Sequence, residues 1–131
     1  MPRILVVDDE PDMLSTCRKF LEREGYEVSV AENGRKGIEA MDVFRPDLVI
    51  TDLKMPGLDG MEVLRRAKED HPETVVMMFT GFGTIEDAVE AMKEGAFDFI
   101  AKPFSPDHLL NSVDRALNQK RLVSENRNLQ D

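Results

Sequence analysis

The sequence is short of cysteine and histidine, and each shortage excludes a class of site. Its 131 residues include one cysteine, Cys17, so no internal disulfide can form. Only two histidines are present, His71 and His108, and they stand apart in loop-like contexts, so we expect no zinc site. Cys17 lies at helical spacing with Leu14 and Leu21, which indicates a buried small hydrophobe.

Long apolar runs are also missing. No stretch approaches the ~20 apolar residues that a membrane-spanning helix needs. The first apolar run, Ile4–Val7, is short and ends in acidic residues, which is typical of a strand and not of a secretory signal. We therefore expect no membrane contact and a cytoplasmic location.

Basic residues are outnumbered by acidic ones. The chain has 17 Lys and Arg against 26 Asp and Glu, a net charge of −9. Affinity for a phosphate backbone comes from basic side chains that displace counterions, so this balance argues against direct binding to nucleic acid. It suits cations, basic peptides or a protein partner better.

The sequence does contain a regular alternation of short apolar runs with helical patterns. The runs fall at 4–7, 26–30, 48–50, 75–79 and 97–101, and several are apolar throughout, as strands covered on both faces are. The stretches between them carry the 3.6-residue period of amphipathic helices. Pro11 suits a first helical turn, and Thr84 followed by Asp87 resembles a capping box. We predict an α/β fold of five βα units, with a parallel sheet and helices on both faces.

The length allows one domain, which we place at residues 1–120. Residues 121–131 are polar and match a heptad pattern poorly. We leave two interpretations open for this segment: a helical linker or weak coiled coil that prolongs the last helix, or a frayed, solvated tail. A chain that stops inside such a segment suggests a piece of a longer protein, and this remains a hypothesis.

Polar residues follow four of the five predicted strands. The ends of parallel strands share one edge of the sheet, where ligands bind in open α/β folds. That edge would receive carboxylates, a hydroxyl and an ammonium, from Asp8-Asp9-Glu10, Thr51-Asp52, Thr80-Gly81 and Lys102-Pro103.

Each of these residues also has an ordinary structural interpretation. Asp8 or Asp9 could cap the helix that begins at Pro11, and Asp52 could be a turn residue. Thr80 could be a strand residue and Lys102 a solvated charge. The joint pattern favours a site, because independent caps and turns need not converge on one edge.

The chemistry of such a cluster is specific. Carboxylates that repel one another call for a cation, and oxygen ligands beside phosphate favour Mg²⁺. A carboxylate can attack a phosphoryl donor and form an aspartyl phosphate. Mg²⁺ and a lysine neutralise the charge of that transfer, and a threonine hydroxyl gains a partner once the phosphoryl group is present.

The motifs ILVVDDE, DLVITDLKMPGLDG, MMFTGFGT and FDFIAKPF resemble the receiver domain of bacterial two-component response regulators. The resemblance covers residues 3–117. It implies a doubly wound, flavodoxin-like (βα)5 fold with strand order 2-1-3-4-5.

The resemblance also implies a role for each motif residue. Asp52 matches the phosphoacceptor, and the metal shell would comprise Asp8, Asp9, Asp52 and the backbone carbonyl of Lys54. Thr80 and Lys102 match the residues that contact the phosphoryl group, and the Lys102–Pro103 bond would be cis. Thr80 and Phe99 would be the switch residues, and Phe99 occupies the aromatic switch position, three residues before Lys102, where many relatives have tyrosine.

Within the family, TGFGTIEDAVEAMKEGAFDFIAKPF and the tail are most similar to the NtrC-like transcription activators. This implies a sensor histidine kinase as phosphoryl donor, a homodimer, and an output region with an ATPase and a DNA-binding part. The chain itself has no G-x-x-x-x-G-K motif, so it is not that ATPase. A stand-alone, chemotaxis-type receiver remains an alternative.

Two further functions compete with a phosphorylation switch. A metal-dependent phosphohydrolase would need an acid two residues after the nucleophile, where this chain has Lys54, so we do not expect a metabolic enzyme. A pseudo-receiver would act without phosphorylation, but such domains usually lose an acid or the lysine.

Overall fold

The computed structural model describes residues 1–81 and 85–130, and the side chains of residues 1–81 and 86–120. Strands and helices alternate along the chain as the apolar pattern predicted. The strands are β1 (Arg3–Val7), β2 (Glu27–Ala31), β3 (Leu48–Asp52), β4 (Val75–Thr80) and β5 (Asp98–Ala101). The helices are α1 (Pro11–Arg23), α2 (Gly34–Phe44), α3 (Gly60–Asp70), α4 (Ile85–Lys93) and α5 (Pro106–Gln130).

The strands form one parallel sheet in the order β2-β1-β3-β4-β5, which confirms the predicted doubly wound fold. The chain runs outward from β1 to β2, then returns to β3 on the other side of β1. The strand order therefore reverses between β1 and β3, and such a switch point opens a crevice at the carboxyl edge of the sheet.

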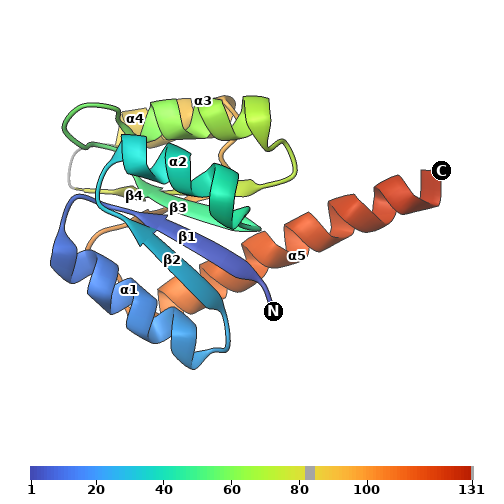
Figure 1. The fold of residues 1–131 in the computed structure, drawn as a ribbon, viewed down its shortest axis with the longest axis horizontal. Helices are drawn as coiled ribbons and strands as arrows, with labels where there is room; N and C mark the ends of the chain where they lie inside the picture. The colour runs from blue at the N-terminus through green and yellow to red at the C-terminus, as the bar shows by residue number, and fades with distance from the viewer. Residues whose placement is uncertain (82–84, 131) are drawn as a thin grey trace.

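Helices cover both faces of the sheet (Figure 1). On one face, α1 and α5 pack over a core that includes Ile4, Ile50 and Phe79, and on the other, α2, α3 and α4 pack over Leu5, Val49 and Met78. Every residue of β3 is buried, as expected for a central strand of a parallel sheet. Because helices pack on both faces of the sheet, the central strands have continuous apolar runs in their sequences.

Three local predictions have clear outcomes. Helix α1 begins at Pro11, Cys17 is buried in the core, and the Lys102–Pro103 bond is cis. The predicted capping box depends on Thr84, which lies outside the described residues.

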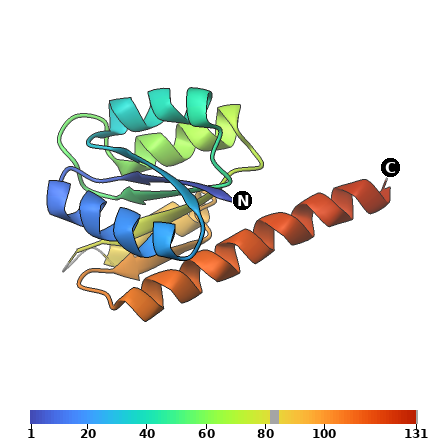
Figure 2. The same cartoon turned by 60° about the horizontal axis from the view of Figure 1, so that its bottom comes forward.

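Helix α5 continues to Gln130, so the helical interpretation of the C-terminal segment applies, and Figure 2 shows this end of the helix projecting away from the domain. The division at residue 120 and the linker role of the segment stay predictions. Among the described helices, none is long and apolar enough to cross a bilayer.

Candidate functional site at the carboxyl edge of the sheet

Three polar side chains predicted from different strand ends meet at the carboxyl edge of the sheet. Asp8 follows β1, Asp52 is the last residue of β3, and Lys102 follows β5. Asp8 has no solvent exposure, and Asp52 is 8% exposed. Their convergence confirms the expectation that strand ends, and not independent turns, arrange these residues.

Lys102 joins the carboxylates. Its Nζ donates to Oδ2 of Asp8 at 2.9 Å and lies 3.4 Å from Oδ2 of Asp52, close enough to interact with both. Nζ also lies 5.7 Å from the centre of the Phe79 ring, which stacks on Phe104 with ring centres 5.3 Å apart. The aromatic pair forms an apolar floor, and a cation above a ring face is stabilised there.

The acidic residues form one compact group. Asp8, Asp9, Glu10 and Asp52 each place a carboxylate oxygen within 4.8 Å of the others. A set of oxygen ligands with several negative charges suits a hard divalent cation such as Mg²⁺ and does not suit a soft metal. The residues therefore fit the metal predicted from the sequence.

Burial sets the electrostatics of the group. It raises the pKa of Asp52, the charge of Asp8 raises it further, and Lys102 offsets only part of the effect. Burial likewise raises the pKa of Asp8, and this effect exceeds the opposite effect of its hydrogen bond to Lys102. Burial lowers the pKa of Lys102, but its hydrogen bond to Asp8 and the charge of Asp52 prevail and raise it above its ordinary value. Lys102 therefore stays charged, while burial disfavours the charged forms of Asp8 and Asp52. Binding of a further cation would stabilise both carboxylates in their charged forms.

Glu10 is a member of this group that the sequence reasoning left out of the site. It occupies the N-cap position of α1, yet its side chain makes no capping hydrogen bond, and its Oε1 lies 3.5 Å from Lys102 Nζ. Asp8 instead accepts a hydrogen bond from the Glu10 backbone N–H at 2.9 Å. The acids after β1 thus turn toward the site and do not simply cap α1. The signal available in the sequence was its place directly after the acidic pair.

Helix α3 presses its first residue against the backbone of Asp52. A Cβ added at Gly60 would lie 2.3 Å from the carbonyl oxygen of Asp52 and 2.8 Å from Cα of Leu53. The helix begins with an Asp59 side chain that accepts from the Glu62 backbone N–H at 3.2 Å. Glycine at position 60 therefore lets α3 hold the strand end that carries Asp52.

Thr80 lies on β4, the strand next to the one that carries Asp52, and Phe99 lies on β5, one strand further out. By strand alternation both belong to the opposite face from Phe79 and Lys102. Thr80 ends β4, is 2% exposed, and stands in register with Ala101. Phe99 is half-buried, stands in register with Met78, and packs against the core on the α2–α4 side. The two predicted switch residues therefore share one face of neighbouring strands, and their functional roles stay predictions.

Lys54 extends away from the acidic group. Its Nζ lies 3.2 Å from Oδ2 of Asp87 on α4, and its side chain is 69% exposed. A phosphohydrolase of the kind considered above would require an acid two residues after Asp52. Lys54 occupies that position, so no acid reaches the site from it. The proposed use of the Lys54 carbonyl as a metal ligand stays a prediction.

Comparison with known proteins identifies the family of this chain. The family model described as the response regulator receiver domain matches residues 4–114. The chain belongs to this family. The receiver family is a family of regulators and not of metabolic enzymes, and its members in general bind Mg²⁺ and are phosphorylated by histidine kinases.

Curated relatives place this receiver among the NtrC-type activators. It is 42% identical over 127 residues to the C4-dicarboxylate transport transcriptional regulatory protein DctD of Pseudomonas aeruginosa, covering 97% of this chain and 28% of DctD. It is 44% identical over 128 residues to the nitrogen assimilation regulatory protein NtrX of Azorhizobium caulinodans, covering 96% of this chain and 28% of NtrX. The receiver thus spans little more than a quarter of these relatives, and the NtrC-like resemblance is confirmed.

A solved receiver structure agrees with the fold. A response regulator receiver domain protein from Clostridium thermocellum is 38% identical, with a TM-score of 0.89, and the match covers 94% of this chain and 99% of that one. The match covers nearly all of both chains, so the receiver fold accounts for the described domain.

Proposed function

We propose that this receiver is a phosphorylation switch in which Asp52 accepts a phosphoryl group from a sensor histidine kinase. The observation that carries the proposal is the placement of Lys102, whose Nζ reaches carboxylate oxygens of both Asp8 and Asp52 within a group of four acids. Burial raises the pKa of both carboxylates, so their charged forms are held at a cost in stability. Such perturbed groups are typical of functional sites, and this favours a role in phosphoryl transfer.

The reaction is a phosphoryl transfer between two groups. A carboxylate oxygen of Asp52 forms a bond to phosphorus while the bond from phosphorus to the donor imidazole nitrogen breaks, and the electron pair leaves with the imidazole. Lys102 neutralises charge on the phosphoryl oxygens, and the apolar floor of Phe79 and Phe104 keeps its ammonium over the site. Hydrolysis of the acyl phosphate by water ends the signal.

Mg²⁺ belongs to the proposal through the residues that would hold it, namely Asp8, Asp9, Asp52 and the backbone carbonyl of Lys54. When bound, the ion supplies positive charge to the transferring phosphoryl group. Glu10 lies in the same group of acids and adds to its negative charge. Lys102 alone cannot balance four carboxylates, which is the electrostatic reason for a metal here.

The output belongs to the proposal as well. Phosphorylation would favour a second conformation through Thr80 and Phe99, on the face covered by α2, α3 and α4, and shift the population toward it. By analogy with the NtrC-type activators, which carry ATPase domains, we propose a change of dimerisation and control of an output region with ATPase and DNA-binding parts, in transcription regulation in the cytoplasm.

The test is intact mass after incubation with acetyl phosphate, with and without Mg²⁺. We expect a metal-dependent gain of one phosphoryl group that is lost in alkali or hydroxylamine, and no gain in Asp52→Asn. Asp59→Asn is the matched control, since Asp59 lies in the loop that follows Asp52 but caps α3, and it should still be labelled. Equal labelling of Asp52→Asn would show that another residue is the acceptor.

A further inference from the structure

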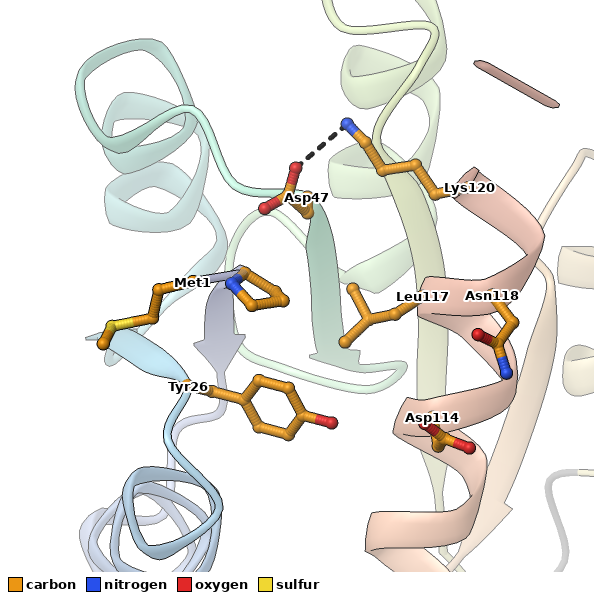
Figure 3. A pocket seen from close by; sticks show the side chains of 8 residues that line it. Met1, Tyr26, Asp47, Asp114, Leu117, Asn118 and Lys120 are labelled. Atoms are coloured by element: carbon orange, nitrogen blue, oxygen red, sulfur yellow. Dashed lines mark ion pairs between the residues drawn. The ribbon is translucent and has the colours of Figure 1, made fainter. Parts of the chain in front are cut away.

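The amino edge of the sheet, opposite the acidic group, is hollowed around the place where α5 leaves the domain. Three cavities of about 660, 400 and 350 Å³ open there. Lys120 lines all three. Figure 3 shows the largest, with Tyr26 and Leu117 facing each other across it and the Lys120 side chain reaching toward Asp47.

The apolar packing of α5 ends at this place for a reason that the sequence makes plain. Leu109, Val113 and Ala116 have no solvent exposure and follow the helical spacing of an inward stripe. One turn later, the next inward position is Lys120. The inward-facing stripe therefore changes from apolar to charged at Lys120. Beyond the last core contacts, α5 is held by an ion pair between Lys120 and Asp47.

Asp47 is a rigid partner for that lysine. Its backbone N–H donates to the Arg3 carbonyl at 2.8 Å, and its Oδ2 accepts from the Arg3 N–H at 2.8 Å. Its own carbonyl accepts from the Val75 N–H at 3.1 Å. The remaining oxygen, Oδ1, lies 3.0 Å from Lys120 Nζ. Asp47 is thus fixed to β1 and β4 before it meets α5, so little of its freedom is lost in the ion pair.

We propose that the Asp47–Lys120 ion pair is the anchor that sets the direction in which the C-terminal part of α5 leaves the domain. The two side chains are 34% and 24% exposed, so solvent screens this pair less than a more exposed pair such as Arg18–Glu22 within α1, where both side chains are 50% exposed. The hollow space on either side of Lys120 gives α5 room to tilt when the pair is broken. Figures 1 and 2 agree that the end of α5 stands clear of the rest of the molecule.

The proposal is independent of phosphorylation and is tested on the whole chain. Spin labels at Val43→Cys and Asn126→Cys report the distance between α2 and the end of α5. Val43 is 87% exposed, and the native Cys17 is buried, with burial raising its pKa to about 12, so it does not compete for the label. The unaltered ion pair should give one narrow distance distribution.

Two single variants remove the ion pair gently. Asp47→Asn keeps an oxygen to accept from the Arg3 N–H, and Lys120→Gln keeps most of the side chain. Each should shift and broaden the distance distribution, and the double variant should do no more than either single one, because the two residues act as a pair. Arg18→Gln removes an ion pair of the same charge type within α1 and should leave the distribution unchanged.

Three results would overturn the anchor. An unchanged distribution in both single variants would show that core packing alone directs α5. A change in Lys120→Gln without one in Asp47→Asn would assign the effect to another contact of the lysine. Equal broadening in Arg18→Gln would reveal a general effect of net charge.

Discussion

Lys102 Nζ lies closer to Oδ2 of Asp8, at 2.9 Å, than to Oδ2 of Asp52, at 3.4 Å. The lysine is thus held chiefly by a buried carboxylate that is not the proposed phosphoacceptor. Lys102 therefore balances the negative charge of Asp52 less well than that of Asp8. The stability of the domain should report that imbalance directly.

Replacing Asp52 with asparagine should stabilise the metal-free domain. The change removes a buried charge whose pKa is raised by burial and by Asp8, and we expect a gain of about 1 kcal/mol in the free energy of unfolding at neutral pH. The gain should shrink when Mg²⁺ is added, since the metal favours the native carboxylate. Denaturant unfolding measures both values. Glu69→Gln, which removes an exposed carboxylate on α3, should change stability by less than ~0.5 kcal/mol.

The same carboxylate predicts how stability depends on pH. The folded-state pKa of Asp52 lies above the ordinary value of 3.8, so between those values the folded protein binds more protons than the unfolded chain. The contribution of Asp52 to the free energy of unfolding therefore falls as the pH rises from about the unfolded-state pKa of 3.8 to the higher folded-state pKa. The difference in unfolding free energy between Asp52→Asn and the parent should grow with pH across this range and then level off. A difference that stays flat, or shrinks, would contradict the raised pKa.

Lys102→Met should separate stability from metal affinity. The variant leaves Asp8 buried without its cation, which should cost roughly 2 kcal/mol of unfolding free energy without metal. Mg²⁺ should bind more tightly than in the parent, because no ammonium repels it. Calorimetric titration measures the affinity. Lys93→Met is the control, since Lys93 pairs only with exposed Glu90 in the described contacts, and weaker Mg²⁺ binding in Lys102→Met would refute the competition.

Gly60→Ala should disturb the strand end that carries Asp52. The added methyl group would lie 2.3 Å from a backbone oxygen that cannot rotate away, so we expect a loss of about 1–3 kcal/mol and slower phosphorylation. Thermal unfolding and labelling by acetyl phosphate measure the two effects. For stability, Gly81→Ala is the matched control, because its added Cβ has nothing within 4 Å.

Thr80→Ala tests the switch separately from the chemistry. Phosphorylation of Asp52 should survive, because the acids and Lys102 remain, while the response to it weakens. Dimerisation before and after labelling, followed by sedimentation, measures that response, and Thr80→Ser should restore it. Normal phosphorylation-dependent dimerisation in Thr80→Ala would remove the proposed role of the hydroxyl.

Strand ends were the part of the site that the sequence predicted well. Asp8, Asp52 and Lys102 converge because parallel strands deliver their carboxyl ends to one edge, and that follows from the apolar pattern alone. The preference of Lys102 for Asp8 did not follow, since it depends on side-chain conformations of residues 94 positions apart. Glu10 was missed for a similar reason, because its place in the acidic run does not show that its side chain turns toward Lys102.

The far end of α5 shows the same limit. The polar composition of residues 121–131 left helix and frayed tail equally open, because the helical stripe of α5 loses its apolar character at Lys120. The Asp47–Lys120 contact was invisible in the sequence, since it joins the start of a strand to a helix that crosses the sheet from edge to edge.

That crossing gives α5 the geometry of a lever. The helix begins close after Lys102 at one edge of the sheet and is anchored at Lys120 at the other, about 21 Å along its axis, with about 15 Å of helix beyond to Gln130. With Lys120 as the fulcrum, a sideways movement of the first turn reappears at the far end reversed in direction and reduced to about 0.7 of its size. A single stiff helix can thus carry a displacement from the carboxyl edge of the sheet, where we propose phosphorylation, to the opposite side of the domain.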